Sequence, residues 1–217
     1  LAAIGELARS RGALFVVDAS QSLGALPLDV AALGIDVVVS VGYKWLMSPH
    51  GIGVLYVAPE AMERIRPSAP GRYSIVEGWQ TTDYDLNWQP DARRYQGGAL
   101  NWIGVAALSA SLSLLNEVGP ERVAALARAN ADALLAGLTD LPVSIESDDR
   151  PERRSQILAF AFGSAEADEA FVRRARDNGV VLGRRALGLR AGTHFWNNEA
   201  DIERLLDLVA AHGKNPR

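Results

Sequence analysis

Near the start of the chain, apolar residues form two short continuous runs, and between them lies a segment whose apolar residues have helical spacing. Ala13–Val17 and Val37–Val41 are compact runs rich in bulky side chains, which is typical of buried parallel strands. The spacing in Leu28–Leu33, between these runs, predicts a short helix. A third strand is expected at Val54–Val57 and a short helix at Pro59–Ile65. This part of the chain therefore predicts a strand–helix–strand unit extended by one further strand.

The same two periodicities predict the other elements. Apolar residues at three- to four-residue intervals indicate helices, and short apolar runs between polar loops indicate strands. The expected helices are Leu1–Ser10, Trp102–Val118, Glu121–Leu138, Ala167–Asp177 and Glu199–Ala211, and the expected strands are Val143–Ile145, Gln156–Phe162, Gly179–Leu182 and a short one reached through Arg185–Arg190. The alternation from about residue 116 onward predicts a small α/β domain next to a larger one.

Composition narrows the class of protein. The 217 residues are 48% hydrophobic, enough for one sizeable core or two small ones, and the formal net charge of -4 gives no basic footprint for nucleic acid. With 0 cysteines, a disulfide framework within this chain is excluded, and the three histidines lie too far apart in sequence for metal-ligand spacing. No apolar run reaches membrane-spanning length, and the charged start is unlike a signal peptide. We therefore expect a cytoplasmic protein with no metal, nucleic acid or membrane partner.

One acidic and one basic side chain follow the first two predicted strands. Asp18 ends the first apolar run, Gln21 stands close to it, and Lys44 comes three residues after the second run. Parallel strands bring their carboxyl ends to one edge of a sheet, where open α/β folds bind ligands. A lysine amine condenses with an aldehyde to a Schiff base, and pyridoxal phosphate (PLP) requires such a lysine and an acidic partner for its ring nitrogen. Spacing alone also fits the alternative that Asp18 is an ordinary carboxylate at a strand end and Lys44 an exposed lysine.

The residues around this pair resemble a known family. VVDASQSLGALPLDV followed by SVGYKWLMSPHGIGVLYV is similar to the D-x-x-Q motif, and the K-W-L motif before G-P-x-G-x-G, of class V aminotransferases, which are fold-type I PLP enzymes. The resemblance implies that Asp18 pairs with the pyridinium nitrogen, that Gln21 contacts the phenolic oxygen and that Lys44 is the Schiff-base lysine. Ser40 and Tyr43 flank the lysine as further candidates for holding the phosphate, or they merely line its loop.

The resemblance also implies an architecture. Residues 1–115 are expected to form the C-terminal part of a large PLP-binding domain, a mostly parallel sheet with helices, and residues 116–217 a small C-terminal α/β domain. The start at Leu1, inside a helix, indicates the C-terminal portion of a larger enzyme. The preceding segment of such an enzyme would carry a phosphate-binding turn and the ring that stacks on PLP, so this chain alone is expected to bind PLP weakly or not at all.

Two further segments continue the likeness but depart from the family pattern. Arg94–Asn101 resembles R-[FY]-E-x-G-T-x-N, in which the threonine reaches the phosphate of the neighbouring subunit of a homodimer. Ala99 replaces that threonine here, which leaves backbone N–H groups around Gly98 as candidate donors.

The second segment, GLRAGTHFWNNEADIERL, resembles R-x-S-x-H-x-Y-N-x-x-x-D-I. The resemblance implies that Arg190 binds a substrate carboxylate, although Gly192 and Trp196 replace the serine and tyrosine. The alternative is that Arg190 is an ordinary surface arginine.

These observations predict a PLP-dependent enzyme that acts on an amino acid through a lysine Schiff base, as an aminotransferase, lyase or epimerase. The lack of a cysteine where cysteine desulfurases carry theirs argues against desulfuration. A homodimer is expected. The alternative is a non-catalytic fragment or relic of such an enzyme that acts as a binding or assembly subunit.

Overall fold

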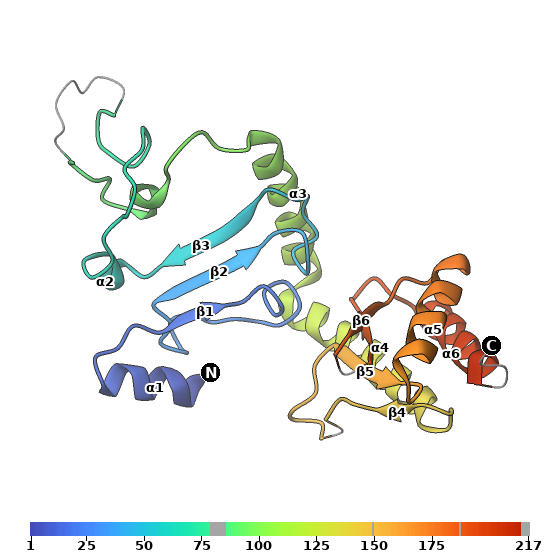
Figure 1. Ribbon diagram of the computed structural model, residues 1–217. Coiled ribbons are helices and arrows are strands. Elements are labelled where there is room, and N and C mark those ends of the chain that lie inside the picture. The colour runs from blue at the N-terminus through green and yellow to red at the C-terminus, as the bar shows by residue number, and fades with distance from the viewer. Residues whose placement is uncertain (79–85, 149, 187, 214–217) are drawn as a thin grey trace. The chain divides into compact units, whose positions relative to one another are not determined.

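The chain forms two compact units, Leu1–Val118 and Gly119–Arg217. The computed structural model describes residues 1–78, 86–148, 150–186 and 188–213 (Figure 1). Within these ranges no single helix is long and apolar enough to cross a membrane. Strands and helices occur in both units, so the predicted α/β class is confirmed.

The first unit is built on a three-stranded sheet in the order β1-β2-β3. β1 pairs with β2 in parallel, and β2 pairs with β3 in antiparallel orientation, so the sheet in this unit is mixed. Figure 1 shows α3 running past the ends of the strands. The elements are α1 (Ala2–Ser10), β1 (Val16–Asp18), β2 (Val37–Val41), β3 (Gly53–Val57), α2 (Pro59–Met62), the 3-10 helix η1 (Ala92–Tyr95) and α3 (Trp102–Val118).

The helix predicted at Leu28–Leu33 is wrong. This stretch forms turns, in which Leu33 N–H donates to the Asp29 carbonyl at 3.1 Å and the Asp29 carboxylate accepts from Ala32 N–H. Gly34 follows at φ +63, a left-handed conformation that stops helix growth. The stretch is little longer than one helical turn, so packing against the rest of the unit does not extend the turn into a helix.

The buried strand predicted at Ala13–Val17 is displaced and more exposed than expected. It runs over Val16–Asp18, and the Val16 side chain is 57% exposed. Side chains alternate between the two faces of a strand. Register places Asp18 and Val39 on one face, and both are exposed, whereas Val38 and Ser40 point to the buried face. The sheet carries its catalytic candidate on the open face.

The second unit has a four-stranded sheet in the order β4-β5-β7-β6, and all three of its pairings are antiparallel. The core consists mainly of Phe160, Phe171, Leu134, Leu189 and Val209, contributed by strands and helices alike. The elements are α4 (Pro120–Thr139), β4 (Ser144–Ile145), β5 (Ile157–Ala161), α5 (Ala165–Asp177), β6 (Gly183–Arg185), β7 (Gly188–Gly192) and α6 (Glu199–Gly213). Alternate residues of β5 are buried, so one face of the sheet packs on the helices.

The strand predicted at Gly179–Leu182 is also wrong. Gly179 lies at φ +76, and Val180 N–H donates to the Ala175 carbonyl at 2.8 Å, so these residues terminate α5. The strand begins only at Gly183. Val180 and Leu182 pack against the core of this unit, whereas Val181 between them is 84% exposed.

Candidate functional site

Asp18 lies at the end of β1, and hydrogen bonds in the turn that follows stabilise its negative charge. Its carboxylate accepts from Ser20 N–H at 2.9 Å. Hydrogen bonds from the Ser20 side chain and backbone hold the pKa of Asp18 below its usual range, and the positive charge of Lys44 lowers it further. The Ser20 hydroxyl also accepts from Val41 N–H at the end of β2. The two strand ends are thus joined, and Asp18 is an exposed, ionised carboxylate near Lys44.

Lys44 lies in a tight loop between β2 and β3. Gly42 N–H donates to the Ile52 carbonyl at 2.9 Å, and Ser48 N–H donates to the Gly42 carbonyl at 2.9 Å. Met47 takes a positive φ of 55° within the loop, and its carbonyl accepts from the Ser111 hydroxyl on α3 at 3.1 Å. Backbone hydrogen bonds therefore define the loop path, and α3 supports it from outside.

The turn after β1 touches the lysine loop at Gly24. A Cβ atom placed on Gly24 would stand 2.4 Å from the Trp45 carbonyl oxygen and 2.9 Å from the Leu46 nitrogen, and Gly24 has φ +94. Only glycine permits both the conformation and the contact. This approach sets the separation between the segment carrying Asp18 and Gln21 and the segment carrying Lys44.

Gln21 meets the residue that follows the lysine. The Trp45 indole N–H donates to Gln21 Oε1 at 3.2 Å, and the Trp45 side chain is 8% exposed. Gln21 itself is exposed. The sequence placed Gln21 at the site but assigned nothing to Trp45. The sequence feature that could have identified Trp45 is its position directly after Lys44 in the motif.

An aromatic pair stands beside the lysine. Tyr43 and His50 stack with ring centroids 4.2 Å apart, and Lys44 Nζ lies 5.9 Å from the Tyr43 ring centroid. Ser40 is buried, and its hydroxyl donates to the Val41 carbonyl at 3.2 Å, on the sheet face away from Asp18. The structure thus brings Tyr43 to the lysine more directly than Ser40. The role predicted for each residue stays a prediction.

Asn101 connects the lysine loop to the start of α3. Its side-chain amide donates to the Gly51 carbonyl at 3.3 Å, and its side-chain oxygen accepts from Gly104 N–H at 3.0 Å, which caps the helix. Gly98 is exposed, and an added Cβ there would meet nothing within 4 Å. The Gly98 carbonyl accepts from the Gln96 amide at 3.1 Å. Gly98 therefore has open space around it, as a contact with another molecule requires.

Arg190 lies in the second unit, on β7. Its cross-strand neighbours are Ala159 and Gly183, two of the smallest residues. Its side chain stands on the sheet face away from the helices, because its neighbours Leu189 and Ala191 are buried in the core. Small neighbours leave room for a bidentate anion contact.

The segment after Arg190 is anchored by Asn130 and Thr193, which the sequence analysis did not single out. The Asn130 amide on α4 donates to the carbonyls of His194 and Asn197, each at 3.0 Å, and the Thr193 hydroxyl donates to the Ala127 carbonyl at 2.9 Å. His194 is buried, and its backbone N–H donates to the Asn197 side chain at 2.8 Å. These contacts hold the end of β7 against α4.

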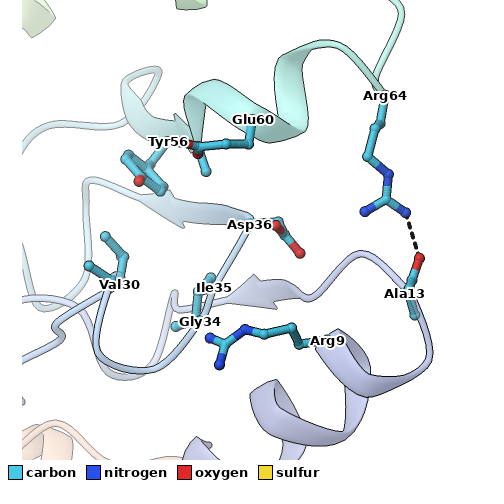
Figure 2. Close-up of a pocket in the computed structure, with 12 residues that line it drawn as sticks. Arg9, Ala13, Val30, Gly34, Ile35, Asp36, Tyr56, Glu60 and Arg64 are labelled. Atoms are coloured by element: carbon cyan, nitrogen blue, oxygen red, sulfur yellow. Dashed lines mark hydrogen bonds between the residues drawn. The ribbon is translucent and has the colours of Figure 1, made fainter.

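A separate hollow of about 300 Å3 opens at the opposite ends of the strands. Figure 2 shows Arg9, Asp36 and Arg64 around it, and Arg64 donates to the Gly12 carbonyl at 2.7 Å. Asp36 accepts from Phe15 N–H at 2.7 Å. Because Asp36 precedes β2 whereas Lys44 follows it, this hollow is distinct from the lysine site, and none of the predicted site residues lines it.

The donor set at the lysine site fits PLP. An ionised carboxylate suits a protonated ring nitrogen, and a primary amine suits an aldehyde carbon. Because an indole N–H is only a donor, it must face the oxygen of the Gln21 amide, and the remaining NH2 group suits an oxygen acceptor. The residues that would hold the ring and the aldehyde are therefore Asp18, Gln21 and Lys44.

Comparison with known proteins agrees with this chemistry. The chain is 28% identical over 218 residues to the uncharacterized aminotransferase YcbU of Bacillus subtilis, covering 96% of this chain and 54% of the relative. It is 31% identical over 199 residues to a cysteine desulfurase of Klebsiella pneumoniae, covering 89% of this chain and 45% of the relative. The chain thus spans about half the length of the curated relatives it matches.

A solved structure gives the same fold with the cofactor in place. A mutant of C-DES, in which glycine is covalently linked to the PLP cofactor, matches with a TM-score of 0.86 at 26% identity, covering 97% of this chain and 56% of that one. The family model described as Aminotransferase class-V matches residues 1–205. Because this match extends over nearly the whole sequence, the resemblance expected from the motifs is confirmed, and the chain belongs to the class V aminotransferase family.

Proposed function

We propose that this chain carries the lysine-containing part of a PLP-dependent enzyme that acts on an amino acid. PLP is the cofactor of this family. The observation that carries the proposal is the junction of two strand ends, where the ionised carboxylate of Asp18 lies within electrostatic reach of Lys44. In this role Lys44 binds the cofactor aldehyde covalently, Asp18 keeps the ring nitrogen protonated, and Gln21 donates to the phenolic oxygen.

The proposal gives each residue a separate task. When bound, PLP supplies an electron sink for the substrate α-carbon. With the cofactor and substrate bound, the Lys44 amine would act as the general base that takes the proton from that carbon. Asp18 stays ionised because Ser20 stabilises its charge, so it holds the proton on the ring nitrogen throughout. Arg190 binds the substrate carboxylate.

The proposal also covers points beyond the family assignment. We propose that residues 1–115 form the remainder of a large domain and residues 116–217 a small domain. We also propose that Ser40, Tyr43 and Gly98 contact the cofactor phosphate, and that the protein is a cytoplasmic homodimer. Transamination, elimination and epimerisation all begin with the steps above. The relatives include cysteine desulfurases. This chain has no cysteine, so we do not propose that reaction. Nothing specific in the comparisons supports the non-catalytic alternative.

Borohydride reduction tests the central step. The full-length protein is loaded with PLP, reduced and digested, and the pyridoxyl-labelled peptide is identified by mass spectrometry. We expect the label on Lys44 and its loss in Lys44→Ala, whereas Lys214→Ala, which removes the only other lysine of this chain, should keep it. A label on a different lysine, or none, refutes the proposal.

A further inference from the structure

Trp45 has no assigned role, although it directly follows the proposed cofactor lysine. It is the most buried aromatic side chain of the lysine loop at 8% exposed, and its indole N–H donates to Gln21 Oε1 at 3.2 Å. The partner residue, Gln21, lies on the other segment of the site, 24 positions earlier. The contact therefore spans the two strand ends that the site depends on.

The chemistry of this contact determines the orientation of the amide. An indole nitrogen donates one hydrogen bond and accepts none, whereas a glutamine amide has one accepting and one donating end. Were the amide turned over, two donors would face each other, and a buried indole N–H would be left without an acceptor. Trp45 thus selects the rotamer in which the oxygen of Gln21 faces the indole and the NH2 group faces away from it.

The backbone around Trp45 makes this selection stable. Its carbonyl oxygen lies against Gly24 so closely that a Cβ atom there would be 2.4 Å away, so the loop cannot shift without disturbing the turn after β1. The Gly42–Ser48 backbone hydrogen bond of 2.9 Å closes the loop on its other side. A rigid donor on a closed loop favours the rotamers of the partner side chain that accept its hydrogen bond.

We infer that Trp45 is a positioning residue that holds the Gln21 amide so that its NH2 group donates to the phenolic oxygen of PLP. The inference rests on the proposed function, because it requires the ring to lie between Asp18 and Lys44. A hydrogen bond donated to the charged form of that oxygen stabilises it. Trp45 therefore lowers the pH at which the bound cofactor loses its shared proton, without touching the cofactor itself.

The test is a pH titration of the visible absorbance of the holoenzyme, made from the full-length protein. Trp45→Phe keeps an aromatic ring but removes the N–H, and we expect the midpoint to move up by about half to one pH unit, the shift that corresponds to one hydrogen bond. Trp45→His retains a ring N–H and should move the midpoint less. Trp102→Phe is the matched control, because that tryptophan is 67% exposed at the start of α3, and it should leave the midpoint unchanged.

A double-mutant cycle separates positioning from general damage. Gln21→Glu still accepts from the indole but has no NH2 donor, so it should raise the midpoint at least as much as Trp45→Phe. If Trp45 acts through Gln21, adding Trp45→Phe to Gln21→Glu produces no further shift. An unchanged midpoint in Trp45→Phe, or a fully additive shift in the double variant, overturns the inference.

Failure of the proposed function has a different signature. It is recognised in the wild-type protein, as the absence of a borohydride label on Lys44, before any tryptophan variant is made. Should Trp45→Phe not fold, Trp45→Met takes its place in the cycle, with the same expected shift and the same refuting results.

Discussion

Gly24→Ala should destabilise the first unit, because Gly24 combines a positive φ with a close backbone contact to the lysine loop. The residue lies at φ +94, a conformation that costs a non-glycine residue about 1–3 kcal/mol. The new Cβ would also stand 2.4 Å from the Trp45 carbonyl oxygen and 2.6 Å from its carbonyl carbon. Overpacking against atoms that cannot rotate away typically costs about 1–3 kcal/mol. The unfolded chain loses entropy on Gly→Ala, which offsets about 0.4–1 kcal/mol.

The net loss expected from these contributions is about 3 kcal/mol of unfolding free energy, a large part of the roughly 5–15 kcal/mol available to a folded domain. Urea denaturation of the PLP-free protein, followed by far-UV circular dichroism, measures it. Gly12→Ala is the matched control in the same unit, because Gly12 also has a positive φ of 62° but an added Cβ there would meet nothing within 4 Å. It should lose only about 1 kcal/mol, because the same backbone cost and the same unfolded-state offset apply but the steric clash does not.

The denaturation midpoints of the two glycine variants test whether the contact between Gly24 and the lysine loop constrains the native structure. If Gly24→Ala and Gly12→Ala shift the denaturation midpoint equally, the close approach of Gly24 to the lysine loop does not constrain the native structure, and the reasoning is wrong. If Gly24→Ala is the more destabilised, the pyridoxyl label on Lys44 should fall with it, because the same contact sets the separation of the two segments of the site.

Three other predictions concern single side chains. Asp18→Asn should keep PLP bound but slow α-proton exchange of the substrate about 100-fold, the effect of losing a preorganised charge partner, and near-normal exchange by NMR would contradict this. Arg190→Lys should raise KM for the amino acid about tenfold with a smaller change in kcat, because lysine keeps the charge but loses the paired donors, and an unchanged KM would make Arg190 a surface residue. His212 is buried against Phe162 and Phe171. Burial lowers its pKa from the usual 6.5 and the charge of Arg174 lowers it further, whereas a hydrogen bond that the imidazole donates to the Ala167 backbone and the charge of Asp168 oppose the shift. The unfolded state therefore takes up this proton first as the pH falls, so the stability contributed above pH 6.5 is lost below it, and urea midpoints measured between pH 7.5 and 5 should fall less in His212→Phe than in the wild type.

The amino-acid sequence alone predicts the long helices and the candidate residues of the lysine site. Trp102–Val118 is predicted with its observed bounds and Val37–Val41 likewise, because a helical segment of seventeen residues, or four valines within five residues, gives a stronger signal than a short turn does. Asp18, Gln21 and Lys44 were named because each followed a predicted strand, and a shared sheet edge is a consequence of parallel pairing. β1 and β2 do pair in parallel, with Asp18 opposite Val39.

Only the tertiary structure decided how these residues are held. The turn at Leu28–Leu33 and the helix ending at Gly179 are short segments whose few hydrogen bonds fit several conformations, and a glycine with positive φ selects the observed one in each case. The exposure of Val16 depends on which sheet face other elements cover, which a pattern of apolar residues does not specify. The contacts of Gly24 with Trp45, and of Trp45 with Gln21, join residues 21 and 24 positions apart. No periodicity encodes such contacts, because they arise from the path of two loops that meet only after both strands have paired.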